Sequence, residues 1–218
     1  MEMERLVEEI VPLSKNITES SIEGEWELIY SSVELFRSSP FFLAIEKALN
    51  DKGKSDLFFK LHLLQVASFG LSTVGRVGQK LDLKKGEIVS IFDTTIFGLT
   101  TIPILGWFKL LPTFGGRVIT LAKTLKLTKD NKLTMELEKT KVSPVPGLGK
   151  IPLINSMLMN KWYSVNAVWK LLPWNKENPD CEVTIVYIDE DTRIVRDMYG
   201  ALFIYVRPSM SLVEPTII

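Results

Sequence analysis

The sequence of 218 residues has little of the chemistry on which most enzymes and metal sites depend. It contains one cysteine, Cys181, and one histidine, His62. A single cysteine can form neither an internal disulfide nor a multi-thiolate metal site. A Ser-His-Asp hydrolase would have to use His62, and the chain has no G-x-S-x-G nucleophile elbow. We therefore predict no catalytic residue, no metal ion and no cofactor.

The sequence also lacks net charge and long apolar runs. Its 26 basic residues balance 26 acidic ones, so it carries no electrostatic signature of a nucleic-acid-binding protein. The longest uncharged window, between Asp93 and Lys109, is interrupted by glycine, threonine and proline, and a bilayer span needs about 20 apolar residues. With 46% hydrophobic residues, the chain favours an apolar partner, and we expect no transmembrane helix.

The length indicates one large domain, or one domain with an appendage. Residues 2–15 have the apolar spacing of an amphipathic helix, which we expect to pack on the main body as residues 1–20. The main domain is expected at 21–208, followed by a tail at 209–218. Helices are predicted at 41–49 and 55–69. Strands are predicted at 24–32, 74–83, 87–97, 117–127, 132–142, 182–188, 193–197 and 201–207.

About eight antiparallel strands joined by short turns favour closure into a barrel or a strongly bent sheet, because closure removes exposed edges. Two apolar insertions, 98–116 and 144–175, interrupt the pattern. Tryptophan beside lysine in such loops suits a water–lipid boundary. Alternatively, both loops fold over the barrel and bury each other, and the two roles can coexist. The candidate membrane-contacting residues are Trp107, Phe108, Trp169 and Trp174.

Four motifs carry a family resemblance. They are Gly24-Glu-Trp-Glu-Leu-Ile-Tyr-Ser-Ser32, Phe36-Arg-Ser-Ser-Pro-Phe-Phe42, Val77-Gly-Gln79 with Asp82, and 187–196 followed by 200–207. In this order they resemble the plastid-lipid-associated protein family, the plant and algal fibrillins, over about residues 24–207. The resemblance implies a mainly β, lipocalin-like (calycin-type) barrel with an N-terminal helix and one or two helices after the first strand. It also implies a peripheral protein of plastoglobules or thylakoids that binds carotenoids, quinones or acyl lipids.

The resemblance assigns roles to individual residues. In lipocalins the arginine that ends the last strand packs over the tryptophan of the first, which gives the pair Trp26 and Arg207 a barrel-closing role through a cation-π contact. Alternation alone selects the candidate ligand-binding residues of the barrel lining, which could instead fill the interior completely. These are Leu28, Tyr30, Phe92, Tyr187, Phe203 and Tyr205.

Four charged residues of the last motif, Asp189, Asp191, Arg193 and Arg196, are candidates for the barrel rim. Paired carboxylates can serve acid–base chemistry, but aspartates that face arginines at a hairpin tip more often form a solvated ion-pair network. We expect them to fix the hairpin or to orient the polar head of a ligand.

Three functions remain open from the sequence. The first is non-enzymatic binding, storage or transport of a hydrophobic small molecule at plastid membranes or plastoglobules. The second is a structural coat for lipid droplets or thylakoid margins, built on a solid barrel without a ligand. The third is an enzyme that acts on an isoprenoid or acyl chain, which would need a titratable group in the barrel. We favour the first.

Overall fold

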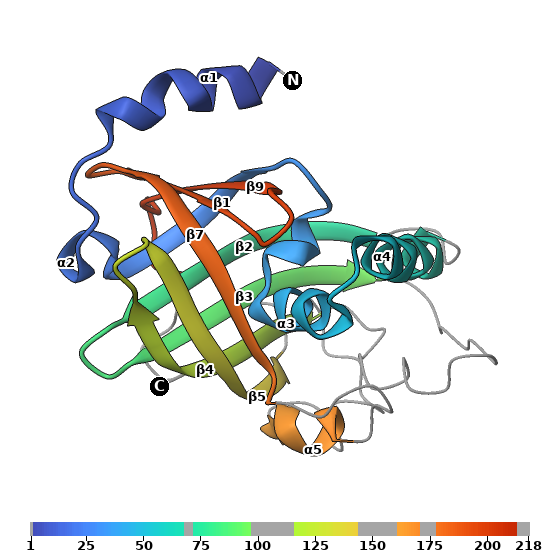
Figure 1. The fold of residues 1–218 in the computed structure, drawn as a ribbon. Coiled ribbons are helices and arrows are strands. Elements are labelled where there is room, and N and C mark those ends of the chain that lie inside the picture. The colour runs from blue at the N-terminus through green and yellow to red at the C-terminus, as the bar shows by residue number, and fades with distance from the viewer. Residues whose placement is uncertain (1, 68–71, 97–115, 144–160, 171–177, 213–218) are drawn as a thin grey trace.

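The computed structural model describes residues 2–67, 72–96, 116–143, 161–170 and 178–212 (Figure 1). Its helices are α1 (Glu2–Ile10), α2 (Glu19–Ile22), α3 (Pro40–Leu49), α4 (Lys52–Ala67) and α5 (Val165–Trp169), with short 3-10 helices η1 (Val11–Leu13) and η2 (Leu35–Ser38). Its strands are β1 (Gly24–Ser31), β2 (Ser72–Asp82), β3 (Glu87–Ile96), β4 (Gly116–Leu127), β5 (Lys132–Ser143), β6 (Tyr163–Ser164), β7 (Asp180–Ile188), β8 (Thr192–Arg196) and β9 (Leu202–Val206).

Eight of these strands close in a ring. They pair antiparallel in the order β1-β2-β3-β4-β5-β7-β8-β9, and β9 pairs again with β1. The short strand β6 adds only an edge to β5. Ring closure satisfies the backbone groups that an open sheet would leave exposed. The prediction of a mainly β, antiparallel fold of about eight strands, with a helix at the start and helices after the first strand, is confirmed and is consistent with a lipocalin-like barrel.

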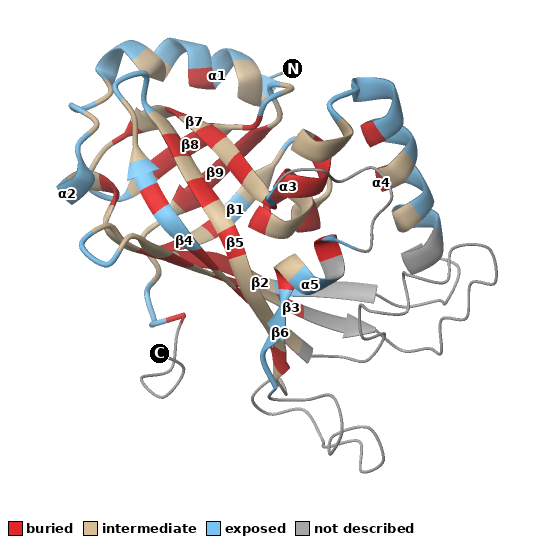
Figure 2. Cartoon of the chain, turned by 60° about the horizontal axis from the view of Figure 1, so that its bottom comes forward, coloured by how far each residue is buried: buried red, intermediate tan, exposed pale blue. Residues whose placement is uncertain are grey.

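The main core lies inside the ring. One cluster of buried side chains collects residues from all eight ring strands, among them Trp26, Leu81, Val195 and Phe203. Only the interior is common to all of these strands, and alternation along β5 and β7 sends every second side chain there. Figure 2 shows the same alternation as red bands along the strands.

A second, smaller core lies outside the ring, where α1 covers β8 and β9. Val7 is 2% exposed and packs with Ile194, Leu202 and Ile204. The pair Glu4 and Arg196, with 2.6 Å between carboxylate oxygen and guanidinium nitrogen, fixes the same contact. The helix ends at Ile10, earlier than residue 15, and Pro12 lies in the 3-10 turn that follows it.

Helices cover the two ends of the ring differently. At one end lies α2, whose first turn is capped by Thr18, the acceptor of a hydrogen bond from the Ser21 amide. At the opposite end lie α3 and α4 (Figure 1). The turn between them is shorter than predicted, because the Asp51 carboxylate accepts a hydrogen bond from the Lys54 amide and caps α4 near its start. We refer to the end covered by α3 and α4 as the mouth.

Candidate functional site

The interior of the ring gathers four of the six residues predicted to line it. Phe203 and Tyr205 are each 1% exposed, and Leu28 is 9% exposed. All three belong to the main core, and Phe92 packs against it. The ring therefore has an aromatic and aliphatic interior to which β1, β3 and β9 contribute.

The other two predicted lining residues lie elsewhere. Tyr30 and Tyr187 pack on the outer core under α1, not in the interior. The pairing register shifts between Leu28 and Tyr30 in β1, and between Ile185 and Tyr187 in β7. A β-bulge inserts one residue and reverses the alternation beyond it. Strict alternation from the buried residues Leu28 and Ile185 therefore assigns Tyr30 and Tyr187 to the wrong face.

Arg193, predicted at the rim, lies in the interior and is 1% exposed. Its Nη2 donates a hydrogen bond to Oε1 of Gln79 at 2.7 Å. Its guanidinium carbon lies 4.6 Å from the ring centre of Tyr205 and 5.1 Å from that of Trp26. Its Nε and Nη1 are buried and have no hydrogen-bond partner within the described chain. Burial lowers the pKa of Arg193 to about 10, which still leaves it charged at neutral pH.

Gln79 connects Arg193 to its surroundings and was not predicted as a site residue. Its Nε2 lies 3.3 Å from the Tyr205 hydroxyl and 3.5 Å from the carbonyl oxygen of Ser38, which belongs to η2. Burial raises the pKa of Tyr205 to about 12, so its hydroxyl stays neutral. The sequence does contain a signal for Gln79. Val77, Gln79 and Leu81 alternate along one strand and so share a face, and Gln79 is the polar residue on that otherwise apolar face.

Trp26 and Arg207 lie together at the α2 end of the ring. The Arg207 guanidinium carbon is 3.6 Å from the Trp26 ring centre, and its nitrogens donate to the carbonyl oxygens of Glu23 at 2.7 Å and Ser21 at 3.1 Å. Gly24 has a φ of +105°, and a Cβ there would lie 2.8 Å from Nη1 of Arg207. The arginine thus ties the last strand to α2 and covers the tryptophan at this end.

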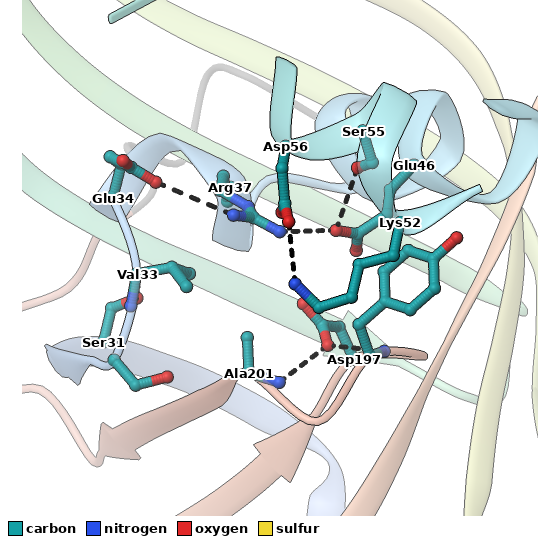
Figure 3. Close-up of polar contacts among 12 residues, drawn as sticks. Ser31, Val33, Glu34, Arg37, Glu46, Lys52, Ser55, Asp56, Asp197 and Ala201 are labelled. Carbon is teal, nitrogen blue, oxygen red and sulfur yellow. Dashed lines mark hydrogen bonds and ion pairs between the residues drawn. The ribbon is translucent and has the colours of Figure 1, made fainter. Parts of the chain in front are cut away.

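A buried charged network lies at the mouth (Figure 3). Arg37 donates to Glu46 of α3 at 2.5 Å, and Ser55 of α4 lies 3.4 Å from the same carboxylate oxygen. Asp197, in the turn before β9, is 6% exposed. Its carboxylate accepts hydrogen bonds from the backbone amides of Tyr199 at 2.9 Å and Ala201 at 2.8 Å. Arg37 and Glu46 thus link η2 to both mouth helices, and the buried carboxylate of Asp197 lies close enough to Glu46 to affect its charge.

Glu46 is buried in this network, and its surroundings disfavour the ionised form of its carboxyl group. Burial, together with repulsion from Asp197, raises the pKa of Glu46 to about 7 in spite of its contact with Arg37. The ionisation of Glu46 therefore falls near neutral pH.

Helix α4 has two apolar faces. Ser55, Phe59 and His62 recur at helical spacing on the inner face, where Phe59 is 2% exposed and His62 lies in a cluster with Phe36 and Phe42. On the opposite face, three leucines are between 46% and 58% exposed: Leu57, Leu61 and Leu64. The exposed lysines Lys54 and Lys60 flank this second face. We call Leu57, Leu61 and Leu64 the leucine stripe.

Comparison with known proteins identifies the family. The PAP_fibrillin family model matches residues 2–206, which is nearly the whole chain. The chain belongs to the PAP/fibrillin family. No curated protein and no solved structure matches it. Within the described residues of this PAP/fibrillin chain, no helix has the length and apolar character needed to cross a bilayer.

The remaining predicted rim charges of this PAP/fibrillin chain do not form one cluster with Arg193. Asp189 accepts hydrogen bonds from the amides of Asp191 at 2.8 Å and Thr192 at 2.6 Å, and so shapes the β7–β8 turn. Asp191 is exposed. Arg196 points to the outer face and pairs with Glu4 of α1. The four charges therefore occupy the interior, the turn and the outer face.

The predicted membrane-contacting residues fall in two groups. Trp107, Phe108 and Trp174 lie outside the described residues, as do most of the insertions 98–116 and 144–175. Trp169, expected at the surface, is 4% exposed and packs in the main core at the end of α5. Its indole therefore has no surface to offer a membrane.

A different tryptophan of the second insertion is exposed near the mouth. Trp162 is 38% exposed, and the ammonium groups of Lys139 and Lys141 lie 4.9 Å and 4.6 Å from its ring centre. Tyr163 beside it is also 38% exposed. An indole flanked by ammonium groups is suited to the headgroup level of a bilayer.

The other residues considered for chemistry are poorly placed for it. Cys181 is 1% exposed, and burial raises the pKa of its thiol well above the ordinary range, so it stays protonated. Burial lowers the pKa of His62 to about 4, so its ring is neutral at physiological pH. Over the described part of the chain, no group of three or more histidine, cysteine, aspartate or glutamate residues could hold a metal ion.

Proposed function

We propose that this PAP/fibrillin chain binds an apolar small molecule within the strand ring, without catalysing a reaction, while its mouth rests on a plastid lipid surface. The ligand classes are an isoprenoid, quinone, carotenoid or acyl lipid, and the surfaces are plastoglobules or thylakoids. The protein is peripheral and exchanges its ligand with the lipid phase.

The leucine stripe of α4 carries this proposal. A helix of a monomeric domain normally turns one apolar face to the core and a polar face to water, whereas α4 turns apolar side chains both ways. The outward leucines lie at the mouth, and Lys54 and Lys60 flank them where lipid phosphates would lie. Trp162, which lies beside Lys139 and Lys141, is a second exposed apolar side chain flanked by lysines. Both surfaces suit an interface with anionic lipid.

The interior supports binding of an apolar guest. Transfer of hydrocarbon from water contributes about 25 cal/mol per Å² of buried apolar surface, and the interior offers aromatic and aliphatic side chains from every ring strand. A mouth in contact with lipid would let the guest enter and leave without crossing water.

A coat protein without a ligand is the second candidate. It is favoured by the packing of large side chains inside the ring, since Trp26, Phe203 and Tyr205 are each at most 1% exposed. In this case the interior would serve stability alone, and the lipid surface would be the only apolar partner.

Flotation of the purified chain with liposomes that contain anionic lipid tests the lipid contact. We expect L57S/L61S to reduce the floated fraction at least severalfold, because it removes apolar side chains that enter the interface. The matched control L13S/M210S changes two residues that are 72% and 70% exposed and lie toward the α2 end of the ring, and it should float like the wild type. Equal flotation of L57S/L61S and the wild type would contradict the proposal.

A further inference from the structure

Arg193 is a charged group that the described fold leaves unsatisfied. A guanidinium has five N–H donors, and the only hydrogen bond described for Arg193 runs from Nη2 to Gln79. Nε and Nη1 are buried without a partner, and among the described residues no carboxylate forms an ion pair with this side chain. Burying a cation is costly unless an anion or a full set of acceptors compensates it.

The other arginine that is buried in the described chain, Arg37, has the carboxylate partner that Arg193 lacks. Arg37 at the mouth is 8% exposed and pairs with Glu46. Arg193 has Gln79, which is neutral, and the faces of Trp26 and Tyr205. Aromatic faces attract a cation but accept little of its hydrogen-bonding capacity. An anionic partner is therefore the missing part of this site.

We propose that Arg193 anchors the ionised head of an apolar acid, a long-chain carboxylate, inside the strand ring. This inference rests on the proposed function, since it names the class of ligand that the ring holds. A carboxylate would satisfy the free N–H groups and neutralise the charge, whereas a neutral carbonyl of a quinone or ester would only accept a hydrogen bond.

The surroundings of Arg193 set the direction of the ligand. The α2 end of the ring is tied shut by Arg207. Gln79, which holds the guanidinium, reaches the Ser38 carbonyl on the mouth side at 3.5 Å, the outer limit of a hydrogen bond. The hydrocarbon tail would therefore run from Arg193 toward the mouth, along Leu28, Phe92 and Phe203.

Isothermal titration of the purified chain with dodecanoate and with its methyl ester tests the anchor, because the two probes share a tail and differ in charge. We expect the wild type to bind dodecanoate about tenfold or more tightly than the ester. The variant R193M should lose this preference and still bind the ester. The control R196M changes the outward arginine of the same strand and should keep the preference.

A second measurement needs no variant and applies even if R193M does not fold. The carboxyl group of 13C-labelled dodecanoate, bound to the wild type, should titrate at a lower pH than in free solution, because a nearby guanidinium favours the ionised form. An unchanged or raised midpoint would overturn the anchor.

The outcomes separate the two proposals. Equal affinity of the wild type for acid and ester, or a preference that R193M retains, would overturn the anchor and leave the proposed function standing. If folded wild-type protein bound neither probe nor any lipid extract, the proposed function would fail and the anchor with it.

Discussion

At the scale of single residues, the Trp26 ring contacts the guanidinium groups of two arginines, Arg193 and Arg207, whose surroundings differ. Arg207 lies 3.6 Å from the indole centre and donates to backbone carbonyl oxygens of Ser21 and Glu23. Arg193 lies 5.1 Å from the same ring and has two nitrogens without partners in the described chain. The fold thus uses the hydrogen-bonding capacity of Arg207, whereas much of that of Arg193 is unused within the described chain.

Replacement of Arg207 should cost stability, because both the cation-π contact and the hydrogen bonds to the α2 segment are lost. We expect R207M to lower the free energy of unfolding by about 2 kcal/mol, measured by urea denaturation. The control R5M removes an arginine whose side chain is 70% exposed and should change stability little. A loss for R207M no larger than that for R5M would show that Arg207 does not secure this end.

Glu46 should give the free energy of unfolding a distinct pH dependence. Burial and Asp197 raise the pKa of Glu46 from 4.5 to about 7 in the folded state, so the folded protein binds more protons than the unfolded one between these values. Its stabilising contribution is complete below pH 4.5 and is lost as pH rises through 7. E46Q should remove this decline, which is on the order of 2 kcal/mol, in denaturation curves taken from pH 4.5 to 7.5.

His62 acts in the opposite direction and must be separated from Glu46. Burial lowers the pKa of His62 from 6.5 to about 4, so its contribution is lost as pH falls through that interval. The Glu46 effect is therefore read as the difference between E46Q and the wild type. The control D56N changes a half-exposed carboxylate of α4 and should keep the wild-type slope; an E46Q slope equal to that of D56N would contradict the account.

At the scale of elements, alternation and caps predict most helices and strands but not the bulges. Buried and partly exposed side chains alternate along most of β5 and β7, as the sequence predicts. The register shifts before Tyr30 and Tyr187 depend on the partner strand, which a single sequence does not specify, and they move both tyrosines to the outer face. In β8, Arg193 and Val195 face the interior, whereas Ile194 and Arg196 face outward. Because each face carries one arginine and one aliphatic residue, the sequence of β8 does not indicate which face is inward.

Two short helices, α2 and α5, had no pattern long enough to predict them. The four-residue helix α2 is recognisable only by its capping box of Thr18 and Ser21. The leucine stripe was hidden for a related reason, because α4 is apolar on both faces and so lacks the polar side that marks an amphipathic helix. The exposure of Leu57 and Leu61 becomes visible only once the inner face has been assigned.

The contact of α1 with the ring should depend mainly on apolar burial around Val7. Glu4 and Arg196 form a pair at 2.6 Å, but their side chains are 36% and 25% exposed, and such pairs contribute little. A double-mutant cycle with E4Q and R196M should give a coupling energy of about 0.5 kcal/mol that shrinks in 1 M salt. A coupling energy that high salt leaves unchanged would contradict the view that the Glu4–Arg196 pair is a weak, solvent-screened contribution beside the apolar burial of Val7.

At the scale of the whole molecule, the two ends of the ring have different roles. Arg207 and α2 tie one end shut through backbone hydrogen bonds. The mouth is covered by separate helices, held by side chains of Arg37, Glu46 and Ser55 (Figure 3). This asymmetry favours entry from the mouth, next to the leucine stripe. The closed β architecture was predictable from the sequence, whereas the placement of polar groups inside it was not.

The central claim is that the ring holds an apolar guest, and organic extraction of the folded, purified full chain after exposure to plastid lipid tests it most directly. Mass spectrometry of the extract should find one class of apolar molecule in a near-stoichiometric amount, and an acid should dominate if Arg193 is its anchor. An extract with only trace lipid of bulk-membrane composition, from protein that still floats with liposomes, would contradict the claim and leave a coat protein with a solid interior.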